Sequence, residues 1–393
     1  MEIQLSDRVN SIKPSPTLAV TNRAAELKAA GHDVIALGAG EPDFDTPEHI
    51  KEAAIKAIRD GRTKYTAVDG TPELKHAIID KFKRDNKLNY EANQILVSCG
   101  GKQSFFNLSL ALLNPGDEVI IPAPYWVSYP DMVLISGGKP VFIDTTVEAR
   151  FKITAEQLEQ AITPKTRLFV INSPSNPSGV AYTRQELTAL AEVLKKHEQV
   201  LIATDDMYEH LLWNEEGFCN LLDVAPELID RTVVLNGVSK AYSMTGWRIG
   251  YAGGPLKLIN AMKKVQSQST SNPASISQAA AVAALNGSQD CIQPMLKAFK
   301  ERHDYIVEAL NAIPGVNCPE SDGTFYSFPG FQGVMERLGM ASDVELAEHL
   351  LVKNGVALVP GSAFGTPGHL RISFATSMGN LEKAMQRLQS LGN

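Results

Sequence analysis

The sequence contains few cysteines and no long apolar run. Its four cysteines, at positions 99, 219, 291 and 318, form no C-x-x-C pair and do not combine with histidines at zinc-finger spacing. Reduced thiols in a cytoplasmic protein are therefore the simplest interpretation. The longest run of hydrophobic residues is seven, at 279–285, whereas a membrane-spanning helix needs about 20. The first eight residues contain no apolar stretch like that of a signal peptide, so we expect no membrane partner.

The sequence also lacks an excess of positive charge. Its 37 Lys and Arg residues are outnumbered by 44 Asp and Glu residues, giving a net charge of −7, which argues against a nucleic-acid partner. The eight histidines do not cluster, and His197-Glu198 does not continue to the H-E-x-x-H of zinc proteases, so we expect no metal site. The 393 residues, of which 44% are hydrophobic and 21% charged, predict two globular domains, or one large domain with an appendage.

What the sequence does contain is an alternation of helical and β-rich segments. Proline and glutamate after Thr46 and after Thr71, and the capping boxes that begin at Thr154 and Thr183, predict four helix starts. Strands are expected at 92–97, 118–121, 140–143, 167–172, 200–204, 232–235 and 248–252. This pattern predicts an α/β fold with a mostly parallel sheet flanked by helices, in which ligands bind beyond the carboxyl ends of the strands.

Polar residues follow several of these strands, and each has a purely structural alternative. Gly100, Gly101 and Lys102 come directly before a helix, where they would hold an anion or form an ordinary turn. The segment 172–179 is a rigid loop with two prolines, or a simple turn. Asp205 ends an apolar strand, where a buried carboxylate needs a cationic partner, unless it is a helix N-cap.

The segment after the strand at 232–235 carries two cations. Lys240 is either a solvated surface charge or, among its small and apolar neighbours, an amine nucleophile with a lowered pKa. Arg248, at the expected start of the next strand, would suit a phosphate as well as a surface carboxylate. An anion cradle, a carboxylate, a nucleophilic lysine and an arginine together fit pyridoxal 5'-phosphate, which binds through a lysine Schiff base with an acid facing its ring nitrogen.

Several segments resemble one known family. The segment 239–251 resembles the cofactor-attachment motif of the class I (fold type I) pyridoxal-phosphate-dependent aminotransferases, and 39–44, 125–126, 172–179 and 370–373 match further blocks of that family in the same order. The resemblance covers about residues 8–390 and is strongest to the bacterial-type aspartate aminotransferases, some of which also use prephenate. It implies a large cofactor-binding domain at 47–284 and a small α+β domain built from 1–46 and 285–393, which would close over the site.

The resemblance also implies how the cofactor would be held. Lys240 would bind it covalently and shuttle the substrate proton, and Asp205 would keep its ring nitrogen protonated. Asn176 and Tyr208 would bind the phenolic oxygen of the ring, and Trp126 would stack on the ring face. The phosphate would be bound by Gly100, Gly101, Lys102, Ser239, Arg248 and, from a neighbouring subunit, Tyr65. The role of Tyr65 implies a homodimer with shared active sites.

For the substrate, the resemblance implies that Arg371 grips the α-carboxylate as a planar fork, beside Gly40. Trp126 and Asn176 would also contact the substrate. The sequence departs from the animal-type aspartate enzymes in two places.

Gly237 stands where many of those enzymes carry a serine that binds the phosphate, and the stretch 266–272 lacks their arginine for the distal carboxylate. Lys102, Thr17 and Lys13 are expected to bind that carboxylate instead, although Lys13 is equally compatible with a solvated surface lysine.

The expected reaction is a ping-pong transfer of the amino group of L-aspartate to 2-oxoglutarate. Prephenate or an aromatic amino acid is the alternative substrate, and a pyridoxal-phosphate-dependent lyase on the same fold is the alternative reaction. A cofactor-binding regulatory module would need an appendage for which the chain has no room. A nicotinamide dehydrogenase is disfavoured because no G-x-G-x-x-G lies between a strand and a helix.

Overall fold

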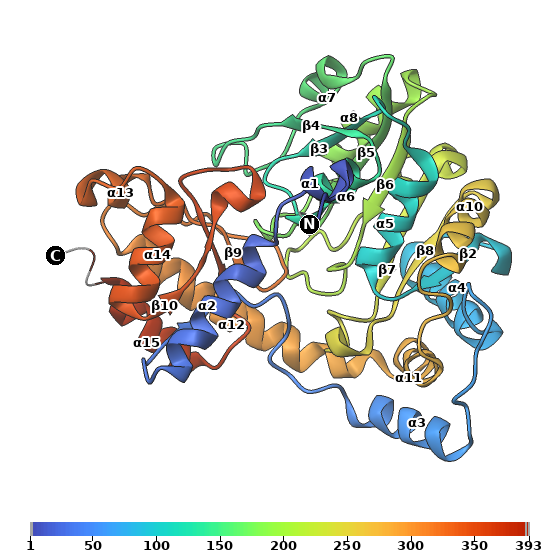
Figure 1. Ribbon diagram of the computed structural model, residues 1–393, viewed down its shortest axis with the longest axis horizontal. Coiled ribbons are helices and arrows are strands. Elements are labelled where there is room, and N and C mark those ends of the chain that lie inside the picture. Colours follow the sequence, from blue (N-terminus) through green and yellow to red (C-terminus); the bar gives the residue numbers. More distant parts are fainter. Residues whose placement is uncertain (1–2, 390, 392–393) are drawn as a thin grey trace.

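The structure, a computed structural model, describes residues 3–389 and 391. Figure 1 shows two lobes, a larger one around a central sheet and a smaller one that contains the C-terminal elements and α2 (Pro16–Ala29). The long helix α12 (Ile292–Asn311) runs between them. Within the described residues, every helix is too short or too polar to cross a membrane.

The larger lobe contains a seven-stranded sheet in the order β2-β8-β7-β6-β5-β3-β4. The strands are β2 (Ile95–Ser98), β3 (Glu118–Pro122), β4 (Lys139–Ile143), β5 (Thr166–Asn172), β6 (Leu201–Asp205), β7 (Thr232–Gly237) and β8 (Gly250–Gly253). β8 is antiparallel to both of its neighbours, and the other adjacent pairs are parallel. The predicted mostly parallel sheet is therefore confirmed. The strand expected at 248–252 begins two residues later, because Arg248 has a left-handed backbone with φ 56°.

Alternation along the strands builds an apolar core on each face of the sheet. Phe169 on β5 belongs to one buried cluster, and its neighbour Leu168 belongs to the other, as expected for side chains that point to opposite faces. Helices α4 (Pro72–Asn86) and α8 (Arg184–Lys196) cover the first cluster. Helices α5 (Gly101–Leu112), α6 (Ser128–Ile135) and α10 (Leu256–Ser267) cover the second. The remaining helices of this lobe are α3 (Glu48–Arg59), α7 (Ala155–Ala161), α9 (Leu221–Val224) and α11 (Ser275–Asn286).

Three of the four predicted helix caps are confirmed. The side chains of Thr71, Thr154 and Thr183 each accept a hydrogen bond from a backbone N–H in the first turn of α4, α7 and α8. The predicted N-cap at Thr46 is wrong, because α3 follows Pro47 as its N-cap residue. The Thr46 hydroxyl instead donates to the Ser243 carbonyl at 2.7 Å, which ties this segment to the loop that follows β7.

The smaller lobe brings together both ends of the chain. β1 (Ile35–Ala36) pairs in parallel with β10 (Val356–Ala357), and β9 (Tyr326–Ser327), β11 (Val359–Pro360) and β12 (Leu370–Ser373) form an antiparallel sheet. Its helices include α13 (Gln332–Leu338), α14 (Asp343–Asn354) and α15 (Met378–Gln389), whereas the short α1 (Asp7–Asn10) lies against α6. Division of the chain at 46/47 and 284/285 stays a prediction.

The N-terminal segment is anchored to α12 where it passes between the lobes. Arg302 on α12 donates to both carboxylate oxygens of Asp43, at 2.7 and 3.0 Å. The ring of Phe44 packs edge-on against Phe299, with centroids 5.8 Å apart. A bidentate ion pair flanked by aromatic rings fixes the path of this segment, which leads from Gly38 and Gly40 to α3.

Candidate active site

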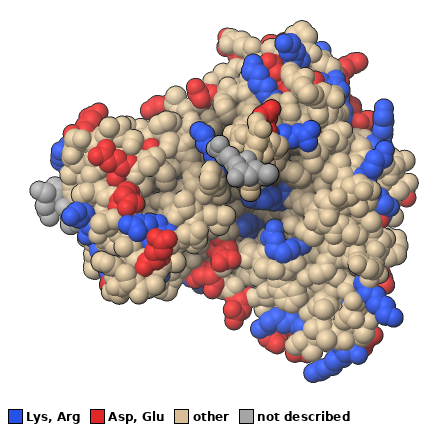
Figure 2. Space-filling view, in the orientation of Figure 1, with Lys and Arg blue, Asp and Glu red and all other residues tan. Residues whose placement is uncertain are grey.

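The sheet brings the predicted site residues to one edge. Asn172 pairs with Asp205, so β5 and β6 end side by side. Gly250, the first residue of β8, pairs with both Ser98 and Gly237, the last residues of β2 and β7. The carboxyl ends of the parallel strands and the start of β8 therefore meet. Figure 2 shows a hollow between the two lobes with Lys and Arg side chains gathered in it.

Close backbone packing joins the start of α5, where the sequence predicts an anion cradle, to β8. Gly100 has φ 89°, and a Cβ atom there would lie 2.4 Å from an Arg248 nitrogen. A Cβ atom on Gly250 would lie 2.2 Å from the Gly101 nitrogen. Glycine at these positions lets the helix N-terminus and its N–H groups lie against β8. Arg248 donates to the carbonyls of Thr245 and Cys99, at 2.8 and 3.3 Å, and so its cation is held beside this helix end.

Lys102 lies on the exposed side of the cradle. Its amine donates to the Ser128 hydroxyl at 3.0 Å and lies 5.1 Å from the centroid of the Trp126 ring. Partial removal from water, with the nearby Arg248 cation, lowers the pKa of Lys102. The side chain therefore bridges the start of α5 and the predicted stacking tryptophan.

Lys240 lies in the middle of the site, partly exposed to the hollow. Its amine donates to the Gly40 carbonyl and lies 5.9 Å from the centroid of Tyr208. Burial, assisted by the Arg371 cation, lowers the pKa of Lys240 to about 8. The sequence-based prediction of a lowered pKa thus has a physical basis here, and about half of the amine is neutral, and hence nucleophilic, near pH 8.

Asp205 is held at the end of β6 by a residue that sequence reasoning missed. The Tyr129 hydroxyl, from α6, donates to the Asp205 carboxylate at 2.5 Å, and the Met207 N–H donates at 3.3 Å. Burial raises the pKa of Asp205, whereas these two hydrogen bonds and the Lys240 cation act to lower it. No helix begins directly after Asp205, since the next one, α9, starts at Leu221, so the N-cap alternative is wrong. Among the described residues, the only cation that is a main influence on the pKa of Asp205 is Lys240.

The loop after β5 connects Asp205 to the smaller lobe. Asn172 donates to the Asp205 carbonyl at 2.9 Å and accepts the Asn176 N–H at 2.8 Å. The Asn176 amide oxygen then accepts a hydrogen bond from Arg371 at 3.0 Å. This bond uses the amide oxygen of Asn176 as an acceptor. The NH₂ group on the other side of the same amide has two donors, which can bind other acceptors.

Arg371, on β12, is a buried cation with only 2% of its surface exposed. It donates to the Gly38 carbonyl at 2.7 Å, and its guanidinium lies 4.5 and 5.0 Å from the ring centroids of Tyr326 and Phe364. Among the described residues, its hydrogen-bond acceptors are this carbonyl and the Asn176 amide oxygen, and neither belongs to a carboxylate. A buried cation held by one carbonyl, one amide and aromatic rings suits a carboxylate ligand, because burial of an unpaired charge is unfavourable.

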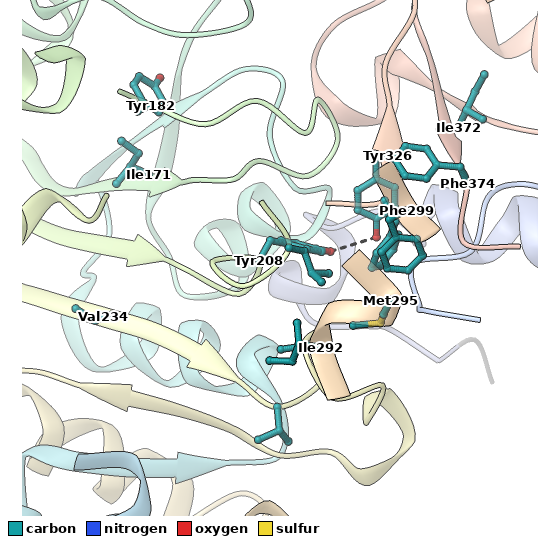
Figure 3. Packing of buried hydrophobic residues seen from close by; sticks show 14 of the residues in the cluster. Ile171, Tyr182, Tyr208, Val234, Ile292, Met295, Phe299, Tyr326, Ile372 and Phe374 are labelled. Atoms are coloured by element: carbon teal, nitrogen blue, oxygen red, sulfur yellow. Dashed lines mark hydrogen bonds between the residues drawn. The ribbon is translucent and has the colours of Figure 1, made fainter. Parts of the chain in front are cut away.

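Tyr208 and Tyr326 form a hydroxyl pair between the lobes. Their oxygens are 3.2 Å apart (Figure 3), and both side chains are buried. Tyr326 was not predicted, and neither was Tyr129. The only available signals were the spacing of Tyr129, three residues after Trp126 at a helix start, and the position of Tyr326 in the Gly/Pro-rich stretch after α12.

The other predicted site residues differ in how far they are buried and in their hydrogen-bond partners. Ser239 is buried beside Lys240, and the Thr17 hydroxyl is buried without a hydrogen-bond partner in the described part of the chain. Lys13 is exposed, and its backbone N–H donates to Asp131 at 3.4 Å. Tyr65 is 92% exposed and lines a surface pocket together with residues of α3 and α11, and the lining contains no other predicted site residue.

Comparisons with known proteins identify the family. The sequence matches the family Aminotransferase class I and II over residues 32–388. It is 62% identical to the aspartate/prephenate aminotransferase of Nitrosomonas europaea over 99% of this chain and 100% of that protein. It is 56% identical to the protein of the same name from Cereibacter sphaeroides, over 98% of each.

Solved structures agree with this match. The aspartate aminotransferase from Rhizobium meliloti has a TM-score of 0.95 at 51% identity, covering 100% of this chain and 99% of that one. The aspartate aminotransferase from Thermus thermophilus with maleate has a TM-score of 0.94 at 44% identity, covering 99% and 100%. These matches cover nearly the whole chain and share its fold, so the chain belongs to the class I and II aminotransferase family.

Proposed function

We propose that this chain is a pyridoxal-phosphate-dependent aminotransferase that moves the amino group of L-aspartate to 2-oxoglutarate. The observation that carries the proposal is Lys240, whose amine has a pKa of about 8 and lies among Asp205, Tyr208 and Arg371. The names of the relatives support aspartate as the donor.

The residues at the sheet edge fit the cofactor. Lys240 would bind its aldehyde carbon, and the Asp205 carboxylate would face its ring nitrogen. The cradle formed by Gly100 and Gly101 with Arg248 would hold its phosphate, because only glycine allows such close backbone approach at these positions. Lys102 directly follows Gly101 in the chain, and Ser239 directly precedes Lys240. Both would also contact the phosphate.

The cofactor supplies an electron sink for a carbanion at the substrate Cα, and the protein supplies position and charge. The Lys240 amine would act as the base that takes the substrate Cα proton and as the acid that gives it back. The hydrogen bonds from Tyr129 and Met207 lower the pKa of Asp205 and so oppose the effect of burial. The free donors of Asn176 and the hydroxyl of Tyr208 would bind the phenolic oxygen of the cofactor.

Arg371 would bind the substrate α-carboxylate, since its guanidinium is buried, fixed on two sides and without a carboxylate partner among the described residues. Lys102, the buried Thr17 hydroxyl and Lys13 are proposed to receive the distal carboxylate. The smaller lobe, which carries Arg371 on β12 and Thr17 on α2, would close over the substrate and exclude water.

The proposal is tested by an absorption spectrum of the purified protein with pyridoxal phosphate. We expect visible absorbance that is lost on addition of L-aspartate and restored by 2-oxoglutarate. The control variant Lys240→Ala should bind the cofactor without forming the lysine linkage. The proposal would be contradicted if Lys240→Ala showed the same visible absorbance as the normal protein. It would also be contradicted if the normal protein responded to no amino acid.

Prephenate is proposed as a second amino acceptor, because the relatives from N. europaea and C. sphaeroides carry both substrates in their names. The same spectral assay tests it, with prephenate replacing 2-oxoglutarate in the second half of the cycle. Failure of prephenate to restore the visible absorbance would limit the acceptors to simple dicarboxylates.

A homodimer is proposed from Tyr65 and its surroundings. Tyr65 is 92% exposed, and Ile58 on the preceding helix is 54% exposed. Such exposure of large apolar side chains is typical of a surface that a partner covers. Light scattering should give twice the chain mass of 42.6 kDa, and Tyr65→Phe should weaken cofactor binding without changing that mass.

A further inference from the structure

Tyr326 is a buried tyrosine of the smaller lobe with two contacts that no prediction assigned. It lies on β9, where it pairs with Ser373 of β12, two residues after Arg371. Its hydroxyl is 3.2 Å from that of Tyr208, and its ring lies under the Arg371 guanidinium at 4.5 Å. Figure 3 shows the two tyrosines reaching toward each other from separate parts of the fold.

We propose that Tyr326 is a positioning residue that directs the Tyr208 hydroxyl proton into the active site. This inference rests on the proposed function, because the acceptor of that proton is the phenolic oxygen of the cofactor. Tyr326 itself does not need to touch the cofactor. It acts by occupying one side of the Tyr208 oxygen as a hydrogen-bond donor.

A count of donors supports this role. Two phenol groups carry two O–H protons, and one of these lies between the two oxygens. Among the residues that the structure describes, neither hydroxyl has another hydrogen-bond partner. The second proton is therefore free to be donated elsewhere, and which tyrosine holds it depends on which hydroxyl donates within the pair.

Charge decides which hydroxyl donates. Arg371 lies against the Tyr326 ring, and a nearby cation makes a phenol a stronger hydrogen-bond donor. Burial raises the pKa of Tyr326, but Arg371 and the bond with Tyr208 both lower it. Burial together with Tyr326 raises the pKa of Tyr208 well above its usual value, and Arg371, whose guanidinium lies over the Tyr326 ring, lowers the pKa of Tyr208 by less than these two raise it. Tyr326 is thus the stronger acid of the pair and donates to Tyr208, whose own proton stays available.

Close packing fixes the position of the Tyr326 side chain and its hydroxyl. Its side chain has no exposed surface, and its ring packs against Phe325 with centroids 4.6 Å apart. A Cβ atom on Gly40 would lie 3.3 Å from its hydroxyl oxygen. The Tyr326 hydroxyl is therefore confined between Tyr208 and the Gly40 backbone, on which the Lys240 amine also rests.

Tyr326→Phe tests the proposal, because phenylalanine keeps the ring under Arg371 and removes only the hydroxyl. The readout is the pH at which the visible absorbance of the bound cofactor changes as the lysine linkage loses its proton. A hydrogen bond donated to the phenolic oxygen stabilises negative charge there and lowers the pKa of the lysine linkage. We expect Tyr326→Phe to raise the pKa of the lysine linkage by about 0.5 unit, less than the effect of a whole neutral hydrogen bond, because Tyr208 keeps its own proton and loses only the donor that orients and polarises its hydroxyl. KM for L-aspartate should stay within about twofold, because the ring contact with Arg371 remains.

Tyr208→Phe and the double variant show whether Tyr326 acts through Tyr208. Tyr208→Phe should raise the same pKa by more, and Tyr208→Phe with Tyr326→Phe should raise it no further, because the two residues form one unit. Tyr90→Phe is the matched control. Its hydroxyl is also buried, has no hydrogen-bond partner in the described part of the chain, and packs against Phe82 outside the site. In Tyr90→Phe, the pKa of the lysine linkage should equal that of the normal protein.

Each outcome has a distinct meaning. A Tyr326→Phe titration equal to that of the normal protein would overturn the inference while the proposed function stands. So would a shift that adds fully to that of Tyr208→Phe, since Tyr326 would then act by another route. Absence of any cofactor absorbance in the normal protein would overturn the proposed function and this inference with it.

Discussion

Replacing Tyr129 by phenylalanine removes one hydrogen bond and little else. The ring is 1% exposed and packs against Phe105 and Trp126, with centroids 4.8 and 5.2 Å apart, and a phenylalanine ring keeps these contacts. The lost group is the hydroxyl that donates to the Asp205 carboxylate at 2.5 Å. Asp205 then keeps only the Met207 N–H, at the longer distance of 3.3 Å.

The size of the effect follows from the charge on Asp205. A hydrogen bond to a charged group contributes about 1.5–3 kcal/mol, which corresponds to a rise of about 1 to 2 units in the pKa of Asp205. Burial already raises this pKa, so the change brings it toward the working pH. A protonated Asp205 no longer favours a cation on the cofactor ring. We expect cofactor affinity and kcat/KM for L-aspartate to fall by at least about 10-fold.

The sign of the pH dependence is fixed by linkage. Because the pKa of Asp205 in the folded protein lies above the unfolded value, ionisation of Asp205 opposes folding, and folding stability falls as pH rises from the unfolded to the folded pKa. Tyr129→Phe raises the folded pKa further. The stability difference between the two proteins should therefore be small near pH 4 and grow toward pH 7.

Urea unfolding of the cofactor-free proteins from pH 4 to 8 measures this difference directly. Tyr182→Phe is the matched control, since the Tyr182 hydroxyl is buried and accepts only a neutral backbone N–H, from Ile153 at 3.0 Å. It should cost about 1 kcal/mol at every pH. If the loss of stability in Tyr129→Phe is also independent of pH, the reasoning is refuted, because the Tyr129 hydroxyl would then not be bonded to an ionised Asp205.

Three further changes test other parts of the site. Arg371→Lys loses the fork that bonds two groups at once, so kcat/KM for L-aspartate should fall about 10- to 150-fold; an unchanged KM would contradict a role in substrate binding. In the cofactor-free protein, the rate at which an amine reagent labels Lys240 should rise with pH through about 8, because the neutral amine reacts; a rate that is flat from about pH 7 to 9 would show a different pKa. Gly250→Ala places a Cβ atom 2.2 Å from the Gly101 nitrogen, so it should weaken cofactor binding and cost about 1–3 kcal/mol of stability. Gly246→Ala, with open space around its Cβ, should do neither, and equal effects of the two would refute the cradle geometry.

Local patterns predicted the elements well where the cause was local. The capping boxes at Thr154 and Thr183 are closed within three residues, so short-range sequence is sufficient. Thr46 has the same local pattern of threonine, proline and glutamate as Thr71, yet its hydroxyl binds the Ser243 carbonyl. A partner almost two hundred residues away leaves no trace in a local window, and it decided the start of α3.

The same limit explains which site residues were found. Lys240, Asp205 and Arg248 follow or precede strands, so the rule about strand ends located them. Tyr129 and Tyr326 contact the site from a helix start and from the smaller lobe, and each is more than seventy residues from the residue it bonds. Their hydroxyls are indistinguishable in sequence from those of Tyr90 or Tyr182, which are equally buried and lie outside the site.

The reversed strand β8 explains why one short segment can carry so much of the site. Parallel strands need a crossover of a dozen or more residues that returns the chain to the opposite edge. A parallel β8 would therefore place Arg248 and Gly250 at the amino ends of the strands, away from Asp205. Because β8 is antiparallel, Gly237 pairs with Gly250, and the segment 238–249 leaves and rejoins the sheet at the same edge. Lys240 and Arg248 are thereby forced into the space above Asp205 and the start of α5. An aminotransferase with this order of motifs thus depends on that single reversal, and a change that uncouples β7 from β8 should remove the lysine and the arginine from the site together.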